Sequence, residues 1–450
     1  MRILQVVHGF PPTRRAGTEI YAYNLSKELS KRHDVYVLYP VMHQSQKRYS
    51  LDKHDINGLH VIELASIPSG LRSWTTPMVS PKSIYRDSRT DSAFETILDE
   101  TRPELVHFQH LIGLSASLIR LCNERAVPTV MTLHDFWLIC HRNHLLKDND
   151  AVCSGPDEEC YSCLQCYSGG LITSAFSALP ALSDNDWMKG IAKAIFNRIF
   201  MLFHGKDFFR QRDSYLKSLV DNVDAIITPS DFMRRRFIEY GLPDEKIRVS
   251  GHGMDTASFD GFVKTKSDRL RFGFVAPFLG NYKGVHVLIQ AFNRVKDDRV
   301  ELRIYGMYNP RSRYYKDLKR AATNPNIHFM NGFVDVRVPY SQMDVLIVPS
   351  LCYESYSLVT QEAFITKTPV IASNIGALPE FVEHNKNGLL FRPGDSDDLY
   401  EKIRALIENP GLIGEFQANI KPVKTIGEQA IELESIYEKL RSHSRASRNA

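Results

Sequence analysis

The chain has 450 residues, of which 43% are hydrophobic and 24% are charged, a composition typical of globular proteins in water. This length exceeds what one hydrophobic core usually organises, so we expect two domains. The net charge of +4 gives no basis for nucleic-acid binding, and no apolar run is long enough to span a bilayer. Because the apolar residues after Met1 are also too few for a signal peptide, we expect a cytoplasmic protein with reduced cysteines.

The first half of the chain alternates strands and helices in the order of a doubly wound sheet. A helix is expected over Thr18–Lys31, where apolar residues recur every four positions. Strands are expected at Arg2–Val7, Asp34–Tyr39, Leu59–Leu64, Leu105–Gln109, Pro128–Leu133, Asp224–Ser230 and Lys246–Ser250. Ligands of such sheets bind at the carboxyl ends of strands, where His134 and His8 both lie. His134 is therefore a candidate site residue, with a purely structural histidine as the alternative.

The second half repeats this pattern after a polar link at Thr256–Asp268. Strands are expected at Leu270–Val275, Val300–Tyr305, Ile327–Met330, Val345–Val348, Pro369–Ala372 and Gly388–Phe391. A helix follows Gly284, and Lys283 stands at its N-terminus, where the helix dipole disfavours a cation. This placement favours an anion such as a phosphate nearby, and an exposed lysine is the alternative.

The segment after the strand Val345–Val348 carries the most informative polar residues. A loop holding Glu354 is followed by Ser357, a residue type that often caps helices. Glu362 lies on or beside the apolar face of the next helix, where a carboxylate is costly unless something binds it. We interpret the segment as a ligand site with free helix N–H groups, and a structural salt bridge is the alternative.

A cluster of cysteines lies between the two halves of the first sheet pattern. The spacing of two residues within the last three members is typical of thiolate ligands, so we predict a structural zinc site formed from Cys140, Cys153, Cys160, Cys163 and Cys166. Free thiols and a disulfide are the alternatives.

The segment Asp186–Arg212 is expected to form a helix that is both apolar and basic. Such a helix either lies on an anionic membrane surface or packs in a core with its charges in solvent. The two interpretations remain open at this stage.

Taken together, these motifs resemble the retaining glycosyltransferases of group 1, the family-four type with the GT-B fold. The most specific element is the pair of glutamates eight positions apart, Glu354 and Glu362, and the resemblance covers nearly the whole chain. Around this pair stand Lys283-Gly-Val, Pro369-Val-Ile-Ala-Ser, Gly376-Ala-Leu-Pro-Glu and Asn387-Gly-Leu-Leu-Phe.

The resemblance implies an α/β fold of two doubly wound Rossmann-like domains that face each other across a cleft. The first domain, residues 1–255, would lie on the acceptor side and hold the cysteine-rich insertion 140–166 and the basic segment 186–212. The second domain, residues 256–425, would bind the nucleotide sugar. Residues 426–450 would form a helix that packs back on the first domain and a disordered tail.

The resemblance also implies roles for individual residues. The catalytic group would comprise Lys283, which neutralises the diphosphate leaving group, Glu354, which contacts the hexose, and His134, which touches the transferred sugar. Glu362 would hold the ribose hydroxyls. The remaining donor-binding residues would be Gly17, Gly306, Phe333, Val334, Ser357, Leu358 and Val359, with Phe333 and Val334 flanking the base.

One departure from the family pattern concerns the diphosphate. The family commonly places an arginine shortly before the lysine, where this chain has Pro277. One half of the expected diphosphate clamp is therefore either missing or supplied elsewhere, with Arg14 and Arg15 as the candidates.

The expected function is transfer of a hexose from a nucleotide sugar, with UDP or GDP as the nucleotide, to a glycan or lipid-linked acceptor with retention. Such a reaction serves polysaccharide or cell-surface glycan biosynthesis, and the family needs no metal for catalysis. The expected location is cytoplasmic, with peripheral contact to the cytoplasmic membrane face. A nucleotide-sugar epimerase and a non-catalytic nucleotide-sugar-binding subunit are the alternatives.

Overall fold

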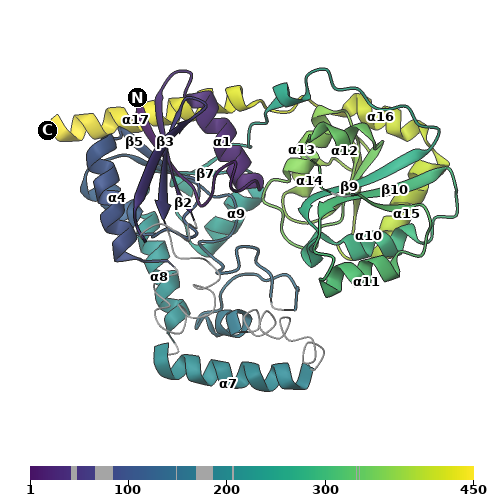
Figure 1. Ribbon diagram of the computed structural model, residues 1–450, viewed down its shortest axis with the longest axis horizontal. Helices are drawn as coiled ribbons and strands as arrows, with labels where there is room; N and C mark the ends of the chain where they lie inside the picture. Colours follow the sequence, from purple (N-terminus) through teal and green to yellow (C-terminus); the bar gives the residue numbers. More distant parts are fainter. Residues whose placement is uncertain are drawn as a thin grey trace. The chain divides into compact units, whose positions relative to one another are not determined.

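The computed structural model describes residues 1–41, 48–65, 85–147, 149–168, 186–204, 207–330, 332–333 and 335–449. The chain divides into two compact units, each built around one sheet (Figure 1). The first unit comprises Met1–Pro229, Arg234–Ser250 and Gly427–Ala450. The second comprises Ser230–Met233 and Gly251–Ile426.

The first unit contains an eight-stranded sheet in the order β3-β4-β2-β1-β5-β6-β7-β8. All neighbouring strands are parallel except the edge pair β3 and β4. The strands are β1 (Arg2–Val6), β2 (Asp34–Val41), β3 (Leu51–Ile56), β4 (Leu59–Ala65), β5 (Leu105–Phe108), β6 (Thr129–Thr132), β7 (Ala225–Thr228) and β8 (Ile247–Val249). The chain runs outward from β1 in one direction and returns to β5 on its other side, which makes the sheet doubly wound.

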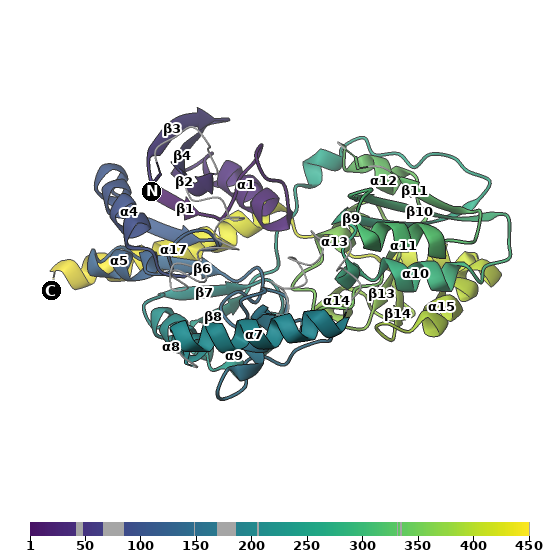
Figure 2. The same ribbon diagram turned by 60° about the horizontal axis from the view of Figure 1, so that its bottom comes forward.

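The helices of the first unit connect these strands and cover the sheet. They are α1 (Gly17–Leu29), α4 (Ser88–Thr101), α5 (Leu118–Glu124), α7 (Asp186–His204), α8 (Phe208–Val220), α9 (Asp231–Tyr240), whose first turn the division assigns to the second unit, and α17 (Ile426–Asn449). The C-terminal helix α17 belongs to this unit, where the Tyr437 hydroxyl lies 2.6 Å from Nδ1 of the buried His107. Helix α7 stands apart from the sheet and comes to the front when the view is turned (Figure 2).

The second unit contains a six-stranded, wholly parallel sheet in the order β11-β10-β9-β12-β13-β14. Its strands are β9 (Leu270–Phe278), β10 (Val300–Met307), β11 (Ile327–Met330), β12 (Val345–Val348), β13 (Val370–Ser373) and β14 (Gly388–Phe391). Its helices are α10 (Val285–Phe292), α11 (Arg313–Ala321), α12 (Arg337–Ser341), α13 (Leu358–Ile365), α14 (Leu378–Phe381), α15 (Ser396–Glu408) and α16 (Gly411–Asn419).

Both faces of the second sheet are buried, as a parallel sheet requires. One apolar core joins strand side chains to α10, α11, α15 and α16, and a second joins the opposite face to α12, α13 and α14. The buried strands are rich in β-branched and other apolar residues, which explains why they could be read from the sequence.

The predicted strands of both sheets are confirmed, one strand was not predicted, and one expected helix is wrong. The edge strand β3 was not predicted, because Leu51–Ile56 is polar and exposed and pairs only with β4. The expected helix Asp186–Arg212 is two helices, α7 and α8, and the sequence between them contains the poor helix former Gly205. Helix α17 extends to Asn449 and so includes most of the tail for which disorder was expected.

Candidate functional site

The second unit places two loops at the point where its strand order reverses. The chain leaves β9 toward β10 and β11 and later returns to β12, which pairs with β9 on the other side. The loops after β9 and β12 therefore diverge at the carboxyl ends of neighbouring strands, the usual ligand position in an open α/β sheet. Lys283 follows β9, and Glu354 follows β12.

Lys283 and Glu354 are in direct contact. Nζ of Lys283 lies 2.8 Å from Oε1 of Glu354, and the Ser350 hydroxyl donates to the same oxygen at 2.6 Å. Burial alone would lower the pKa of Lys283, but the Glu354 carboxylate outweighs it, and the pKa of Lys283 lies above its ordinary value. Lys283 is therefore a permanent cation at this edge of the sheet.

Two glycines in left-handed conformations hold these loops close together. A Cβ on Gly284 (φ 71°) would lie 1.8 Å from the Pro349 carbonyl oxygen, which begins the loop after β12. A Cβ on Gly376 (φ 63°) would lie 2.5 Å from the backbone nitrogen of Glu354. Only glycine allows both approaches, so the two positions fix where Lys283 and Glu354 meet.

The start of helix α13 offers unpaired backbone donors. Among the described residues, the N–H groups of Ser357, Leu358 and Val359 have no hydrogen-bond acceptor. Ser357 occupies the cap position with φ 45°, but its side chain caps no N–H, and its Oγ instead lies 2.7 Å from Oγ1 of Thr360. Ser357 is thus the N-cap residue, as expected, but its side chain leaves the N–H groups open to an anion.

Glu362, one turn further along α13, is bound by a neighbouring phenol. The Tyr340 hydroxyl donates to Oε2 of Glu362 at 2.6 Å, so the carboxylate has a hydrogen bond rather than an ion pair. Burial raises the pKa of Glu362 to about 7, and the Tyr340 hydrogen bond lowers it only in part. Near neutral pH Glu362 therefore changes between its protonated and ionised forms.

The remaining residues of the predicted donor site differ in packing and exposure. A Cβ on Gly306 would meet Leu279 and the Ala276 carbonyl within 3 Å, so packing of β9 against β10 explains this glycine. Phe333 is half-buried, and its ring packs edge-on against Tyr305. Val334 lies outside the described residues. Pro277, which stands where the family has arginine, is exposed near the end of β9.

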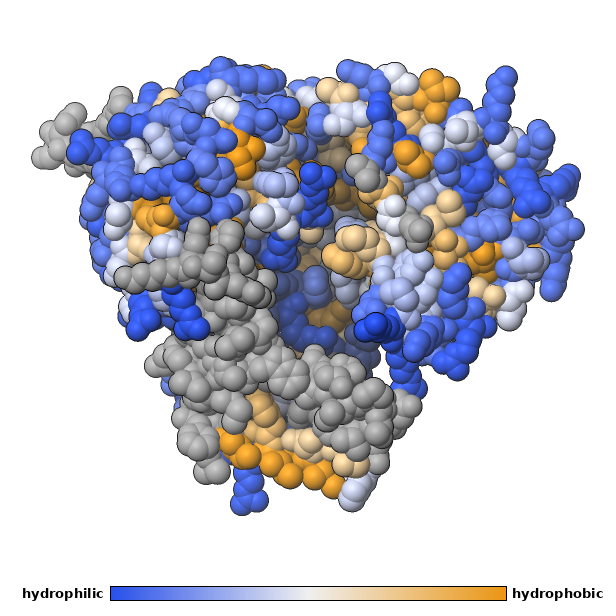
Figure 3. All heavy atoms as spheres, in the orientation of Figure 1, coloured by the Kyte–Doolittle hydropathy of each residue, from blue (hydrophilic) through white to orange (hydrophobic). Residues whose placement is uncertain are grey.

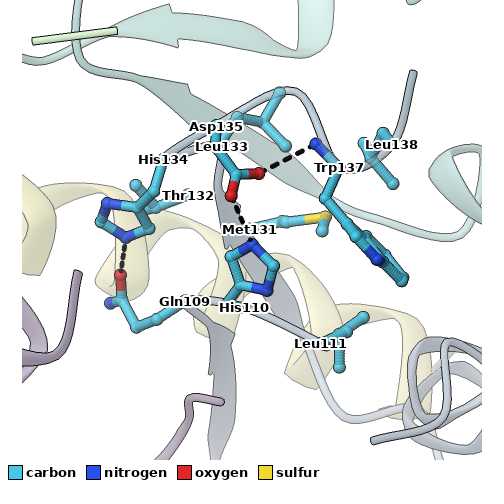
Figure 4. A pocket seen from close by; sticks show the side chains of 10 residues that line it. All are labelled: Gln109, His110, Leu111, Met131, Thr132, Leu133, His134, Asp135, Trp137 and Leu138. Carbon is cyan, nitrogen blue, oxygen red and sulfur yellow. Dashed lines mark hydrogen bonds and ion pairs between the residues drawn. The ribbon is translucent and has the colours of Figure 1, made fainter. Parts of the chain in front are cut away.

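In the first unit, His134 lines a small pocket at the carboxyl ends of β5 and β6 (Figure 4). The pocket is lined by Gln109, His110, Leu111, Met131, Thr132, Leu133, His134, Asp135, Trp137 and Leu138. His134 is buried, with Nε2 2.8 Å from Oε1 of Gln109 and its ring edge-on to Tyr21 of α1. The neighbouring Asp135 accepts the Trp137 N–H at 2.8 Å and lies 3.0 Å from Nε2 of His110.

A second buried pair continues from this pocket toward helix α1. The rings of His8 and His110 lie 4.3 Å apart, and Nε2 of His8 is 3.1 Å from the wholly buried carboxylate of Glu19. Arg14 approaches the same carboxylate oxygen at 2.7 Å. Gly17, predicted to approach a phosphate, is the first residue of α1 in this region.

Sequence reasoning selected His134 as a site residue but assigned no role to the polar residues around it. Glu19, His110 and Asp135 form the larger part of this cluster, and none was predicted as a site residue. The rule that selected His134, a polar residue directly after a strand, also applies to His110 after β5. Glu19 gave no comparable signal, because a glutamate in the first turn of a helix is common on stability grounds alone.

The predicted zinc ligands are not gathered around one point. All seven cysteines are free thiols. Within the described ranges, one group of three potential ligands has its atoms within 4.8 Å of one another, and it contains no cysteine. This group is Asp52, His54 and Glu63 on the edge strands β3 and β4.

Two Rossmann-like units, each with polar side chains at the carboxyl edge of its parallel sheet, define an α/β fold of the GT-B class. The solved structures agree: sucrose-phosphate synthase from Thermosynechococcus elongatus has a TM-score of 0.65 and 17% identity over 98% of this chain and 99% of that one. HepE of Anabaena, in complex with UDP and glucose, has a TM-score of 0.62 and 16% identity over 97% and 99% of the two chains. At such identities the likeness concerns the fold.

Comparison of the sequence with family profiles identifies the family. Residues 269–409 match the profile of the "Glycosyl transferases group 1", and residues 15–151 and 190–258 match that of "Glycosyltransferase Family 4". These matches span most of both units, and the chain belongs to the group 1 glycosyltransferases.

Curated relatives are similar over part of their length. The MMP alpha-(1->4)-mannosyltransferase of Mycolicibacterium hassiacum is 29% identical over 38% of this chain and 42% of its own. The "Putative colanic acid biosynthesis glycosyltransferase WcaL" of Escherichia coli is 29% identical over 46% of this chain and 55% of its own. The chain thus spans about half the length of these relatives.

Proposed function

We propose that this protein transfers a hexose from a nucleoside-diphosphate sugar to a glycan or lipid-linked acceptor with retention of configuration. The observation that carries the proposal is the Lys283–Glu354 pair beside the open N-terminus of α13. One cation, three N–H groups without an acceptor among the described residues, and the Glu362 carboxylate meet the needs of a diphosphate and a ribose.

In this proposal each group has a defined task. Lys283 neutralises the charge that develops on the diphosphate as its bond to the anomeric carbon breaks, an effect that usually contributes much to such catalysis. The N–H groups of Ser357, Leu358 and Val359 bind phosphate or sugar oxygens, while Glu354 contacts the hexose. The acceptor oxygen forms the new bond to the anomeric carbon, and its proton passes to the departing phosphate oxygen.

The first unit would supply the remaining contacts. His134 is proposed to touch the transferred sugar, and the pocket around it has hydrogen-bonding groups suited to hydroxyls. Arg14, whose side chain is 56% exposed beside Gly17, is a candidate for the cation that Pro277 does not provide. Polysaccharide or cell-surface glycan biosynthesis is the proposed setting, since the E. coli relative is named for colanic acid biosynthesis.

The nucleotide is proposed to be UDP or GDP. HepE was solved with UDP-glucose, and a starch synthase of the same fold with ADP, which supports a nucleotide-sugar donor without selecting the base. No metal ion is assigned to catalysis in this proposal, because Lys283 and the α13 N–H groups offer positive charge to the diphosphate.

The donor site is tested first with a panel of UDP-, GDP-, ADP- and TDP-sugars. Each sugar is tested for its ability to raise the thermal stability of the protein. One nucleotide class is expected to stabilise the wild-type protein, and Glu362→Ala is expected to weaken that nucleotide's affinity by about tenfold or more, because a charged hydrogen bond is worth about 1.5–3 kcal/mol. Glu383→Ala, which removes an exposed glutamate of the same unit, is the matched control. Calorimetry that shows equal nucleotide affinity in wild type and Glu362→Ala would count against this site.

Two alternatives to a glycosyltransferase are a non-catalytic subunit, which the absence of the arginine at Pro277 would fit, and an epimerase. A non-catalytic subunit would bind the nucleotide sugar but transfer nothing, and Pro277 is compatible with it. An epimerase of the same fold would convert the donor without any acceptor. Product analysis with and without acceptor distinguishes the three, and we expect release of the nucleoside diphosphate together with a glycosylated acceptor.

We further propose that helix α7 binds the surface of an anionic membrane. Among the described residues no helix is long and apolar enough to cross a bilayer. Trp187, Ile191 and Ile195 recur every four residues along α7 and are 74%, 41% and 54% exposed. Figure 3 shows apolar side chains in a band over this helix. Arg198 is exposed on α7, and such an arrangement suits the boundary of anionic lipids.

Vesicle flotation tests the membrane proposal. The wild-type protein is expected to float with vesicles of phosphatidylglycerol and phosphatidylcholine at low salt and less so at high salt. Trp187→Ala combined with Ile195→Ala is expected to lower the bound fraction at least fivefold. Ile431→Ala, which removes another exposed isoleucine from α17, should bind as the wild type does. Equal binding by all variants would contradict the role of α7.

A further inference from the structure

The edge of the first sheet carries three potential metal ligands on one face. Residues directly opposite each other in an antiparallel pair lie on the same face of a sheet, as do residues two positions apart on one strand. Asp52 of β3 is the register partner of Glu63 of β4, and His54 lies two residues after Asp52 (Figure 2 shows these strands). One ligand atom from each of the three residues lies within 4.8 Å of the other two. The backbone register therefore gathers these side chains at one place.

The distances between these ligand atoms suit a single metal ion. Metal bonds of about 2.0–2.2 Å to nitrogen and oxygen place the ligand atoms around one ion about 3–4 Å apart. Nε2 of His54 lies 4.0 Å from Oε1 of Glu63, which is already at the upper end of that range. The separations up to 4.8 Å require side-chain shifts of only about an ångström. Asp52 and His54 can make such shifts because both are exposed, so their rotation disturbs no core packing.

The arrangement places two carboxylates directly opposite each other, which is unfavourable without a cation between them. Among the residues that the structure describes, no lysine or arginine forms an ion pair with Asp52. Lys53 points to the other face of the strand and contacts Glu100 there. Charged side chains do protect an edge strand from pairing with other chains, but that purpose does not require two carboxylates to face each other. A divalent cation would turn the repulsion between Asp52 and Glu63 into attraction.

The Glu63 carboxylate is held in place by a buried phenol. Tyr39 of β2 is the register partner of Glu63 on the other side, and its hydroxyl donates to Oε1 of Glu63. Tyr39 is 1% exposed and Glu63 is 8% exposed, so neither side chain has much freedom to move. Hydrogen bonds of this kind orient the carboxylates that ligate metals. Glu63 is therefore a pre-oriented ligand, and the two exposed side chains can close on an ion that it binds.

We propose that Asp52, His54 and Glu63 bind one divalent cation of the first transition series, such as Mn²⁺ or Zn²⁺, with water in the remaining positions. Two carboxylate oxygens and one imidazole nitrogen suit this class, whereas Mg²⁺ and Ca²⁺ prefer oxygen ligands alone. His54 coordinates through an unprotonated nitrogen, so a protonated imidazole releases its proton to solvent as the ion binds. The ion would fasten the polar edge strand β3 to β4. The site lies in the first unit and takes no part in the proposed transfer reaction.

Titration of the full chain with Mn²⁺, followed by electron paramagnetic resonance, tests the proposal. Mn²⁺ is the probe because thiolates prefer softer metals, so the cysteines of this chain compete little for it. No nucleotide is present, since a diphosphate binds Mn²⁺ itself. The wild-type protein is expected to bind one Mn²⁺ per chain. Asp52→Asn and His54→Ala should each lower the affinity at least tenfold, and Tyr39→Phe should lower it about tenfold, as the loss of an outer-shell contact does.

His60→Ala is the matched control. His60 is an exposed histidine of β4 on the opposite face of the same two strands, where its register partner is Asp55. Its ring nitrogens lie 2.8 Å from Asp55 and 3.2 Å from Asp34, so it too is a histidine beside two carboxylates. These carboxylates contact different nitrogens of the ring, and one ion cannot bind all three residues in this arrangement. His60→Ala should therefore bind Mn²⁺ as the wild type does.

A second measurement identifies the ligand nitrogen in the wild-type protein and does not depend on how well a variant folds. Electron spin echo envelope modulation of bound Mn²⁺ is expected to show coupling to one imidazole nitrogen, retained in His60→Ala and absent in His54→Ala. Mn²⁺ should also raise the thermal midpoint of the wild type, because it binds the folded state. Wild-type protein that binds no Mn²⁺ at millimolar concentration would overturn the proposal. Equal affinity in wild type and His54→Ala, or equal loss in His60→Ala and His54→Ala, would overturn it as well.

Discussion

The carboxyl edges of the two sheets hold charge in different ways. In the second unit, Lys283 is paired with Glu354 while three N–H groups at the start of α13 have no acceptor among the described residues. In the first unit, His8, Glu19, His110 and Asp135 are buried or half-buried and engaged with one another. The second edge is therefore open to an external anion, whereas the first pairs Glu19 with His8 and Arg14 and leaves a small pocket beside His134.

The pKa values reflect the same contrast. In the first unit, burial and then the neighbouring His110 lower the pKa of His8, which favours its neutral imidazole. In the second unit the pKa of Lys283 is raised although burial opposes it, and the pKa of Glu362 is raised to about 7 by burial. The edge of the first unit thus holds a neutral imidazole. The edge of the second unit holds a cation, Lys283, and a carboxyl group, Glu362, that a ligand could bind.

The largest effect is expected from removal of the cation at the open edge. Lys283→Ala should lower turnover about 10²-fold or more, the loss seen when one group that stabilises transition-state charge is removed. Steady-state kinetics with the donor found in the panel measures it. Lys386→Ala, which breaks an exposed ion pair with Glu383 in the same unit, should leave turnover unchanged. Turnover of Lys283→Ala within threefold of wild type would mean that the carboxyl edge of the second sheet does not bind the diphosphate through Lys283.

The next effect concerns Glu362 and its dependence on pH. Its pKa is raised from 4.5 to about 7 in the folded protein, so its contribution to stability is full below pH 4.5 and is lost as pH rises through about 7. The gap between these pKa values corresponds to about 3 kcal/mol at most. Glu362→Gln cannot ionise, and its free energy of unfolding should fall less than that of wild type between pH 4.5 and pH 8.

Urea unfolding of both proteins at these two pH values measures the difference. Glu383→Gln serves as the comparison, because Glu383 is exposed and its pKa is lowered by Lys386 and Lys421 rather than raised by burial. Parallel pH profiles for wild type and Glu362→Gln would show that Glu362 is ionised throughout, and the buried phenol of Tyr340 would then have to be a stronger partner than its single hydrogen bond indicates.

The sequence predicted the site residues of the second unit better than those of the first. The reason is how close each residue lies in sequence to the end of a strand or helix. Lys283, Glu354 and Glu362 each lie within a few residues of a clear strand or helix boundary, so a doubly wound order alone places them on one edge. In the first unit, the contact of Glu19 with His8 joins a helix to the end of a strand, and no periodicity shows which side chains will meet there.

Three other structural features could not be predicted from the sequence, each for a physical reason. The edge strand β3 is polar because it faces solvent, so it lacks the apolar signal of its neighbours. The Tyr340–Glu362 hydrogen bond joins α12 to α13 across the core, and Ser357 takes a left-handed conformation that its residue type does not suggest. Propensity and spacing predict elements, but contacts between elements depend on packing.

The smallest effect is expected at the self-contained edge. Glu19→Gln removes a buried carboxylate that contacts Nε2 of His8 and Nε of Arg14, and we expect a loss of about 2 kcal/mol in the free energy of unfolding at pH 7. Burial by itself raises the pKa of Glu19, but His8 and Arg14 lower it below its ordinary value. The stabilisation is therefore present above pH 4.5 and is lost as pH falls through the lower, folded-state pKa.

Glu100→Gln breaks the exposed contact of Glu100 with Lys53 in the same unit and should change the stability by less than about 0.5 kcal/mol. Equal stability of Glu19→Gln and Glu100→Gln in urea at pH 7 would contradict a buried, charge-bearing role for Glu19. A loss confined to Glu19→Gln, with nucleotide affinity unchanged, would instead show that the first edge stabilises the fold while the second serves the ligand.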